Sequence, residues 1–290
     1  MKKIGIILLS FHLLSGSANA SQWGSVSHNN IVGYTANEST LVETTSFCYY
    51  LTNLTTESLQ KDSCKRVLGG IIQGNTSKKR IALVFTGHEF ADGGKVILRA
   101  LKKQHVKGSF FLTGDFYRTY PKLVKQLQNE GCYLGPHSDK HILYADWSKR
   151  DSTLVSREVF RKDLMDNYQA MTKAGINMPK SLYFLPSYEW YNLDISLWCS
   201  EMGVQLINFT PGTTSNADYT VPQMKNYRSS DEIYHNIMNY EQIYTLNGFM
   251  LLIHIGTDIR RTDKLYNYLD KIISDLKSKG YEFVPVDKLL

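Results

Sequence analysis

Several features are scarce or absent in this chain of 290 residues, and each absence narrows the class of protein. With only four cysteines and no C-x-x-C pair, a zinc site built from thiolates is disfavoured. No apolar run reaches the roughly 18 residues that a transmembrane helix needs. The net charge of +6 is mild, and no basic run or RNA-binding motif accompanies it, which argues against a nucleic-acid partner. No repeat or low-complexity block is visible, so solenoids and disordered tails are set aside.

The first twenty residues have the three regions of a signal peptide. Met1-Lys2-Lys3 is basic, Ile4 to Leu14 is mostly apolar, and Ala18-Asn19-Ala20 supplies small residues before a cleavage site at Ser21. The apolar part is too short to span a bilayer, and no cysteine follows that could carry a lipid anchor. We therefore expect residues 1–20 to be removed and the mature chain to be periplasmic or secreted, with no membrane insertion.

Residues 21–77 differ in composition from the rest, being rich in Ser, Thr and Asn, and are predicted to form an N-terminal extension. An exported chain can form disulfides, and the cysteines are Cys48, Cys64, Cys132 and Cys199. Pairing of Cys48 with Cys64 and of Cys132 with Cys199 is one of three possible connectivities, among which sequence cannot choose.

The remaining residues, 78–290, alternate strand and helix signals. Residues 78–85, an apolar run after a basic lead-in, are typical of a buried strand, and residues 106–114 are predicted to form a second strand. Residues 95–103 between them read as an amphipathic helix, which completes a right-handed strand-helix-strand unit. A segment of this length suits one α/β barrel domain of about 200 to 250 residues.

Two histidines four residues apart mark a candidate site. His137 and His141 follow the short apolar segment 132–134, and four residues are about one helical turn, so both rings can leave one face and converge on a metal ion. His254 ends another buried-strand pattern, residues 249–253. The alternative is that His137 and His141 are surface or helix-capping histidines.

The segment Gly135-Pro136-His137-Ser138-Asp139-Lys140-His141 resembles the H-S-x-x-H motif of NodB-type polysaccharide deacetylases, carbohydrate esterase family 4. The resemblance extends in motif order over residues 78–290, and it implies a distorted (β/α) barrel. It also implies a divalent metal, commonly zinc, held by a strand-end carboxylate and by two histidines, here His137 and His141.

The family's first motif, Phe-Asp-Asp-Gly, carries a general base and then a metal-binding aspartate, and this chain departs from it. An alignment from Phe85 places Thr86, Gly87 and His88 where the two aspartates and the glycine should stand. An alignment on Phe90 keeps only the metal-binding aspartate. The resemblance then favours Asp92 as a metal ligand and Glu89 as the base, with His88 as a spare ligand.

These carboxylates have a second interpretation. Glu89 and Asp92 precede the helix predicted at residues 95–103, so its dipole alone can hold them there.

The third motif also departs from the family pattern Phe-Arg-Pro-x-Tyr, whose arginine orients the base. The sequence reads Phe184-Leu185-Pro186-Ser187-Tyr188, so Leu185 supplies no charge and Arg260 or Arg261 would have to substitute. Aromatic residues at the end of this segment are either a sugar-stacking wall or part of the core. The candidates for substrate binding are Tyr188, Trp190 and Tyr191.

The last two motifs concern proton transfer. Residues 215–219 resemble the family's Asp-Trp motif, and residues 251–254 resemble the segment that carries a catalytic histidine. By this resemblance His254 protonates the leaving group and Asp218 holds its tautomer, which suits general acid catalysis near neutral pH. The alternative for His254 is a structural histidine bonded to a backbone carbonyl.

Together these motifs predict an exported metal-dependent deacetylase that acts on an acetylated carbohydrate or polysaccharide through a metal-activated water. The missing aspartates and arginine make a second class credible, a carbohydrate-binding pseudoenzyme that kept the barrel and lost turnover. A glycoside hydrolase is a weaker third class, because it would leave the paired histidines unexplained.

Overall fold

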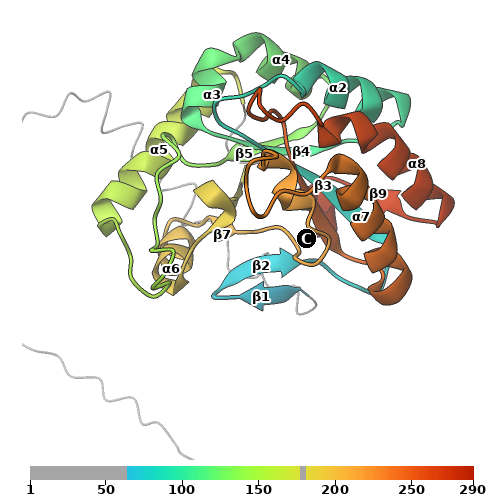
Figure 1. Ribbon diagram of the computed structural model, residues 1–290. Helices are drawn as coiled ribbons and strands as arrows, with labels where there is room; N and C mark the ends of the chain where they lie inside the picture. The colour runs from blue at the N-terminus through green and yellow to red at the C-terminus, as the bar shows by residue number, and fades with distance from the viewer. Residues whose placement is uncertain (1–63, 177–180) are drawn as a thin grey trace, which may run out of the picture. The chain divides into compact units, whose positions relative to one another are not determined.

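The computed structural model describes residues 64–176 and 181–290 (Figure 1). The predicted signal peptide, Cys48 and residues 21–63 of the predicted extension lie outside these ranges. The strands are β1 (Lys65–Val67), β2 (Gly70–Gln73), β3 (Arg80–Gly87), β4 (Ser109–Leu112), β5 (Tyr133–Pro136), β6 (Tyr183–Phe184), β7 (Gln205–Leu206), β8 (Phe249–His254) and β9 (Glu282–Phe283). The helices are α2 (Gly94–Lys103), α3 (Gly114–Thr119), α4 (Pro121–Asn129), α5 (Arg157–Lys173), α6 (Leu193–Glu201), α7 (Ser230–Tyr244), α8 (Leu269–Ser278) and α9 (Val286–Leu289). Three 3₁₀ helices are η3 (Ser187–Glu189), η4 (Ser215–Tyr219) and η5 (Leu265–Tyr268).

A parallel sheet in the order β5-β4-β3-β8 is the centre of the domain, and β9 pairs with the first residues of β3. Strand β3 is buried on both faces, and its side chains alternate between two clusters. Ile81, Leu83 and Phe85 pack in the larger cluster with the helices, whereas Ala82 and Val84 pack in a smaller one. This explains why the strand reads as a continuous apolar run instead of an alternating one.

Short strands continue the sheet toward a closed barrel. The Leu185 N–H donates to the Pro136 carbonyl at 3.3 Å, which links the end of β5 to the segment after β6. Strand β7 pairs with β6, and its continuation meets β2 through a parallel bridge between Ile71 and Ile207. The Thr210 N–H then donates to the Met250 carbonyl of β8 at 3.0 Å. The barrel predicted from the resemblance is therefore present, with its closure made by two-residue strands and single bridges.

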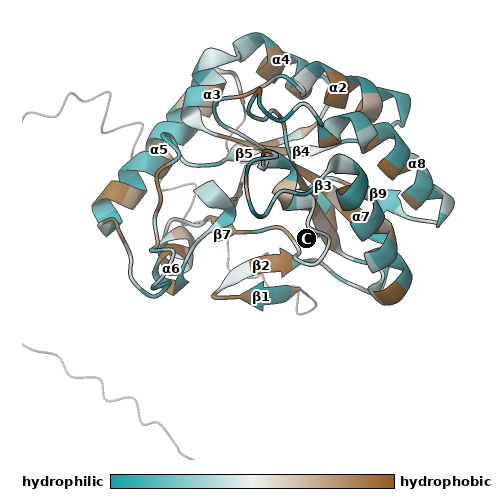
Figure 2. Cartoon of the chain, viewed as in Figure 1, coloured by the Kyte–Doolittle hydropathy of each residue, from teal (hydrophilic) through white to brown (hydrophobic). Residues whose placement is uncertain are grey.

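Helices lie around the sheet and carry both hydrophobic and hydrophilic residues (Figure 2), and α2, α4 and α8 bury mainly their apolar ones. The predicted helix at residues 95–103 is confirmed as α2, which buries Ile97, Leu98 and Leu101 and packs against α8. The predicted strands at residues 106–114 and 249–253 are confirmed as β4 and β8. Within residues 64–176 and 181–290, no helix combines the length and apolar character needed to cross a bilayer.

The predicted disulfide between Cys132 and Cys199 is wrong, because both residues are free thiols. Cys199 lies on α6 and is fully buried in the core cluster, where burial raises the pKa of its thiol far above the usual range. Cys132 packs on the edge of the same cluster, and burial raises its pKa to about 11. Each sulfur is accommodated as a small apolar side chain, as free cysteine commonly is.

Candidate functional site

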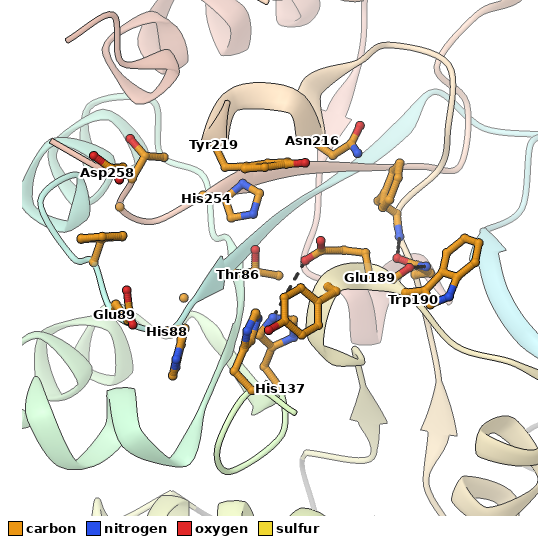
Figure 3. A pocket seen from close by; sticks show the side chains of 18 of the residues that line it. Thr86, His88, Glu89, His137, Glu189, Trp190, Asn216, Tyr219, His254 and Asp258 are labelled. Carbon is orange, nitrogen blue, oxygen red and sulfur yellow. Dashed lines mark hydrogen bonds and ion pairs between the residues drawn. The ribbon is translucent and has the colours of Figure 1, made fainter. Parts of the chain in front are cut away.

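A cavity of about 830 Å³ opens at the carboxyl ends of the parallel strands, where barrel enzymes place their sites. The segments that follow β3, β5, β6 and β8 all contribute to its wall (Figure 3). Its size is in the range of pockets that hold small-molecule ligands. Among the predicted site residues, those that line it are Glu89, His137, His141, Tyr188, Trp190, Tyr191 and His254.

His137 directly follows β5 and is almost fully buried. Its Nδ1 lies 2.7 Å from the Leu185 carbonyl oxygen, which can only accept, so Nδ1 carries the proton and Nε2 keeps its lone pair. Burial lowers the pKa of His137 to about 3, so the ring is neutral at physiological pH. A neutral imidazole with one nitrogen bonded to a backbone carbonyl is the usual form of a metal-binding histidine.

His141 is brought to His137 by a loop, and the predicted helical turn between them is wrong. Ser138 and His141 have φ of 75° and 56°, and these left-handed residues turn the chain back so that the two ring centroids lie 5.2 Å apart. Burial and the neighbouring His137 lower the pKa of His141 to about 2. Its ring stacks on His88 at 4.6 Å and meets Tyr188 at 4.3 Å.

The structure does not bring Asp92 together with these histidines. One Asp92 oxygen accepts from the Tyr266 hydroxyl at 2.7 Å and lies 3.0 Å from the Lys264 Nζ, while the other accepts from the Thr257 N–H. Burial raises the pKa of Asp92, but the hydrogen bonds from Tyr266 and Lys264 outweigh it and lower the value. Asp92 lies outside the wall of the cavity that contains the histidines, and it fixes the segment after β8 to the start of α2.

Glu89, the predicted base, lines the cavity at its rim with an exposed side chain. Its backbone carbonyl accepts a hydrogen bond from the Tyr120 hydroxyl at 2.5 Å. An exposed side chain that must hold one position loses rotamer entropy. Within the described residues, no hydrogen bond or ion pair holds the Glu89 carboxylate in place.

The donors available to a metal are therefore two histidines. In the described part of the chain, no three His, Cys, Asp or Glu side chains converge as a metal site requires. The neutral state of both rings and the free Nε2 of His137 fit a divalent cation. The anionic ligand expected from Asp92 does not join them.

His254 and Asp218 form a close pair on the opposite side of the cavity. Asp218, on η4, is buried, and its two oxygens accept from the His254 backbone N–H at 2.9 Å and face its Nδ1 at 2.6 Å. Burial lowers the pKa of His254, but the charge of Asp218 and its hydrogen bond outweigh this effect and raise the pKa to about 8. The imidazole is thus mostly protonated at neutral pH, with Nε2–H as its remaining donor.

The sequence analysis missed Glu189, a carboxylate in the centre of the cavity. It follows Tyr188 at the end of η3, and its side chain is only 12% exposed. One carboxylate oxygen lies 3.9 Å from Nε2 of His137. Burial raises its pKa, against the opposing effects of His254 and the Thr86 hydroxyl. An acid just past a barrel strand is the signal that could have identified it.

Aromatic side chains flank the histidines. Tyr188 is exposed and Trp190 partly so, and Trp190 meets Trp147 at 5.4 Å between ring centroids. Trp147, 54% exposed, was missed by the sequence analysis. Tyr191, by contrast, is 1% exposed and donates its hydroxyl to the Val67 carbonyl, so the prediction that its ring stacks on a sugar is not supported by its position.

Neither candidate for the missing third-motif arginine reaches a carboxylate of the cavity centre. Arg260 is exposed and binds Asp258 through its guanidinium. Arg261 is fully buried and donates to the carbonyls of Thr220 and Arg228. Leu185, at the position of the arginine, contributes its backbone carbonyl to His137 instead of a charge.

Comparisons with known proteins identify the family. The model of the polysaccharide deacetylase family matches residues 73–207. An uncharacterized 30.6 kDa protein of Geobacillus stearothermophilus is 30% identical over 223 residues, which are 77% of this chain and 75% of that protein. The peptidoglycan-N-acetylmuramic acid deacetylase PdaA of Bacillus subtilis is 28% identical over 75% of this chain and 73% of its own length.

A solved structure shares the fold. BA3943 of Bacillus anthracis, described as a CE4 family pseudoenzyme, superimposes with a TM-score of 0.61 at 20% identity, over 77% of this chain and 69% of that one. The chain therefore belongs to the polysaccharide deacetylase family, carbohydrate esterase family 4, as its histidine motif predicted, and that family includes both enzymes and pseudoenzymes.

Proposed function

We propose that this protein is an exported deacetylase that removes acetyl groups from a carbohydrate. The observation that carries the proposal is the His254–Asp218 pair, in which a buried carboxylate keeps an imidazole protonated beside a cavity. A group of this kind can donate a proton to a departing amine or alcohol. Binding alone would not require such a proton donor.

The substrate class follows from the shape of the cavity and from the relatives. Tyr188, Trp190 and Trp147 offer aromatic faces at one end of the cavity, and such faces suit the apolar faces of sugar rings. PdaA is named for N-acetylmuramic acid in peptidoglycan, so acetylated peptidoglycan is the first substrate to test.

A divalent cation, with zinc as the first candidate, is part of the proposal. His137 and His141 would hold it, since both are neutral and His137 has its proton fixed on the nitrogen that faces away. When bound, the cation would act as a Lewis acid toward the acetyl group. The protein's own residues then hold the sugar, exclude water and move the protons.

Acetate release is the decisive measurement. Purified protein is incubated with peptidoglycan, with N-acetylglucosamine oligomers and with an O-acetylated xylan, each with zinc and with a chelator. We expect acetate from at least one N-acetylated substrate and a large loss of rate with chelator. A protein that binds these glycans and releases no acetate from any of them would instead be a pseudoenzyme.

The pseudoenzyme is the second candidate function, and two observations favour it. Thr86 and Gly87 stand where the resemblance expects two aspartates, and Asp92 is held away by Tyr266 and Lys264. Binding of acetylated glycan without turnover would then be the function of the cavity.

Export is proposed on the sequence alone. The mature chain is expected to begin at Ser21 and to be found outside the cytoplasm, because the first twenty residues have the regions of a signal peptide. Mass spectrometry of the exported protein measures its N-terminus. An exported chain that still begins at Met1 would contradict the prediction.

A further inference from the structure

The end of β3 lacks the acids that the family resemblance places there, and the structure limits what could replace them. Thr86 lies opposite His254 in the register of β3 and β8 and is 1% exposed. Its hydroxyl lines the cavity beside the Glu189 carboxylate, whose pKa it lowers.

Gly87 cannot easily carry a side chain. A Cβ built at this position would lie 2.6 Å from a methyl carbon of Ile255 and 2.9 Å from one of Leu112, so packing around it would have to move. An aspartate at position 87 would therefore displace the core between β3, β4 and β8. The carboxylate nearest to His137 comes from another segment.

Glu189 supplies a carboxylate from the segment after β6. Tyr188 and Glu189 have φ of 60° and 53°, two consecutive left-handed residues that turn the Glu189 side chain toward the cavity centre. The Glu189 N–H donates to the Pro186 carbonyl at 3.0 Å, and its own carbonyl accepts from the Asn208 side chain at 2.6 Å. Such backbone conformations are unfavourable on their own and persist where the surrounding structure holds them.

The Glu189 carboxylate faces the groups that a hydrolytic reaction would use. Figure 3 shows it between His137 and His254, close to Thr86, whereas Glu89 lies toward the edge of the view. Within the described residues it has no Lys or Arg partner that would occupy its oxygens in an ion pair. Its side chain is only 12% exposed, and hydrogen bonds hold its backbone on both sides.

We propose that Glu189 is the general base of this deacetylase and takes over the part of the aspartate that Thr86 replaces. The proposal rests on the proposed function. Glu189 accepts a proton from the attacking water while the water oxygen bonds to the acetyl carbon. His254 then donates its Nε2 proton to the leaving nitrogen or oxygen as the acetyl bond breaks, which gives acetate and the free amine or alcohol. Proton exchange with solvent returns both residues to their starting states.

Kinetics of four variants test this assignment on the substrate that gives the highest acetate release. Glu189→Gln keeps the shape of the side chain and is expected to lower kcat by about 10²-fold or more with little change in KM. Glu201→Gln, an exposed glutamate on α6, is the matched control and is expected to retain wild-type kinetics. Glu89→Gln tests the rim carboxylate that the sequence analysis favoured.

The double variant Glu189→Gln/Thr86→Asp separates catalysis from structure. It returns a carboxylate to the cavity from β3, so we expect it to recover at least about tenfold of the rate lost in Glu189→Gln. Thermal melting of each variant shows whether the protein is folded. If the double variant does not fold, Glu189→Asp takes its place, because it keeps a carboxylate at position 189. A structural role for Glu189 would not be restored by an acid on another strand.

The outcomes distinguish this inference from the proposed function. If Glu189→Gln keeps wild-type activity, or if only Glu89→Gln loses it, Glu189 is not the general base. The proposed deacetylase function is unaffected by either result. A wild-type protein that releases no acetate overturns the proposed function and the base with it.

Discussion

Replacing His254 with glutamine is expected to lower the rate of acetate release at pH 7 by about 10²-fold or more, the usual size of a general acid contribution. Glutamine can still bond to Asp218, so the pair keeps a hydrogen bond while the proton donor is lost. The measurement is kcat on the best substrate, with His235→Gln as the control, since His235 is an exposed histidine on α7. Equal rates in the wild type and the His254 variant would remove the general acid from the mechanism.

The His254–Asp218 pair also predicts how the rate of acetate release changes at alkaline pH. With a pKa of about 8, His254 is protonated below this value, so acetate release should fall as pH rises through 8. Asp218→Asn removes the negative charge that raises the pKa and leaves burial, which lowers it. The fall in rate should therefore move to lower pH in this variant. A pH profile that does not shift would show that Asp218 does not set the protonation of His254.

The second large expected effect is a loss of zinc affinity in variants of the two paired histidines. His137→Ala and His141→Ala are each expected to weaken zinc binding by about 10²-fold or more, because the described residues offer no third His, Cys, Asp or Glu to compensate. Zinc bound after equilibrium dialysis, measured on folded protein, gives the affinity without any need for activity. His235→Ala is again the control.

Asp92→Asn distinguishes the sequence prediction from the structure. If Asp92 is a metal ligand, its loss must weaken zinc binding; if it remains bound to Tyr266, Lys264 and Thr257, zinc affinity stays unchanged. The structure predicts unchanged affinity. Equal zinc affinity of the wild type and both histidine variants would rule out the metal site itself.

The sequence predicted those parts of the fold that local patterns determine. Strands β3 and β8 each contain an unbroken apolar run, at residues 81–85 and 249–253, and helix α2 has one apolar face, so each element has its own sequence signal. Strands β6 and β7 have two residues each, and only their pairing with each other and their neighbours defines them. Such short strands have no periodicity to detect.

The candidate site was only partly predictable from the sequence. Asp218 and His254 came from motif order, and the structure places them in contact. Asp92 was assigned from its neighbours in sequence, but its partners Tyr266 and Lys264 come from the segment after β8, far along the chain. Glu189 was missed because its side chain is directed inward by two consecutive left-handed residues, a conformation that no sequence pattern predicted.

The left-handed residues around the cavity also bear on the stability of the fold. Ser138, His141, Tyr188 and Glu189 all have positive φ without being glycine, and all lie in the segments that follow strands β5 and β6. Substitution by glycine would relieve this strain, so mutations that ease it are only a few base changes away. His141, Tyr188 and Glu189 line the cavity, so this backbone strain lies in the wall that a ligand would contact, where it fixes the shape of the site.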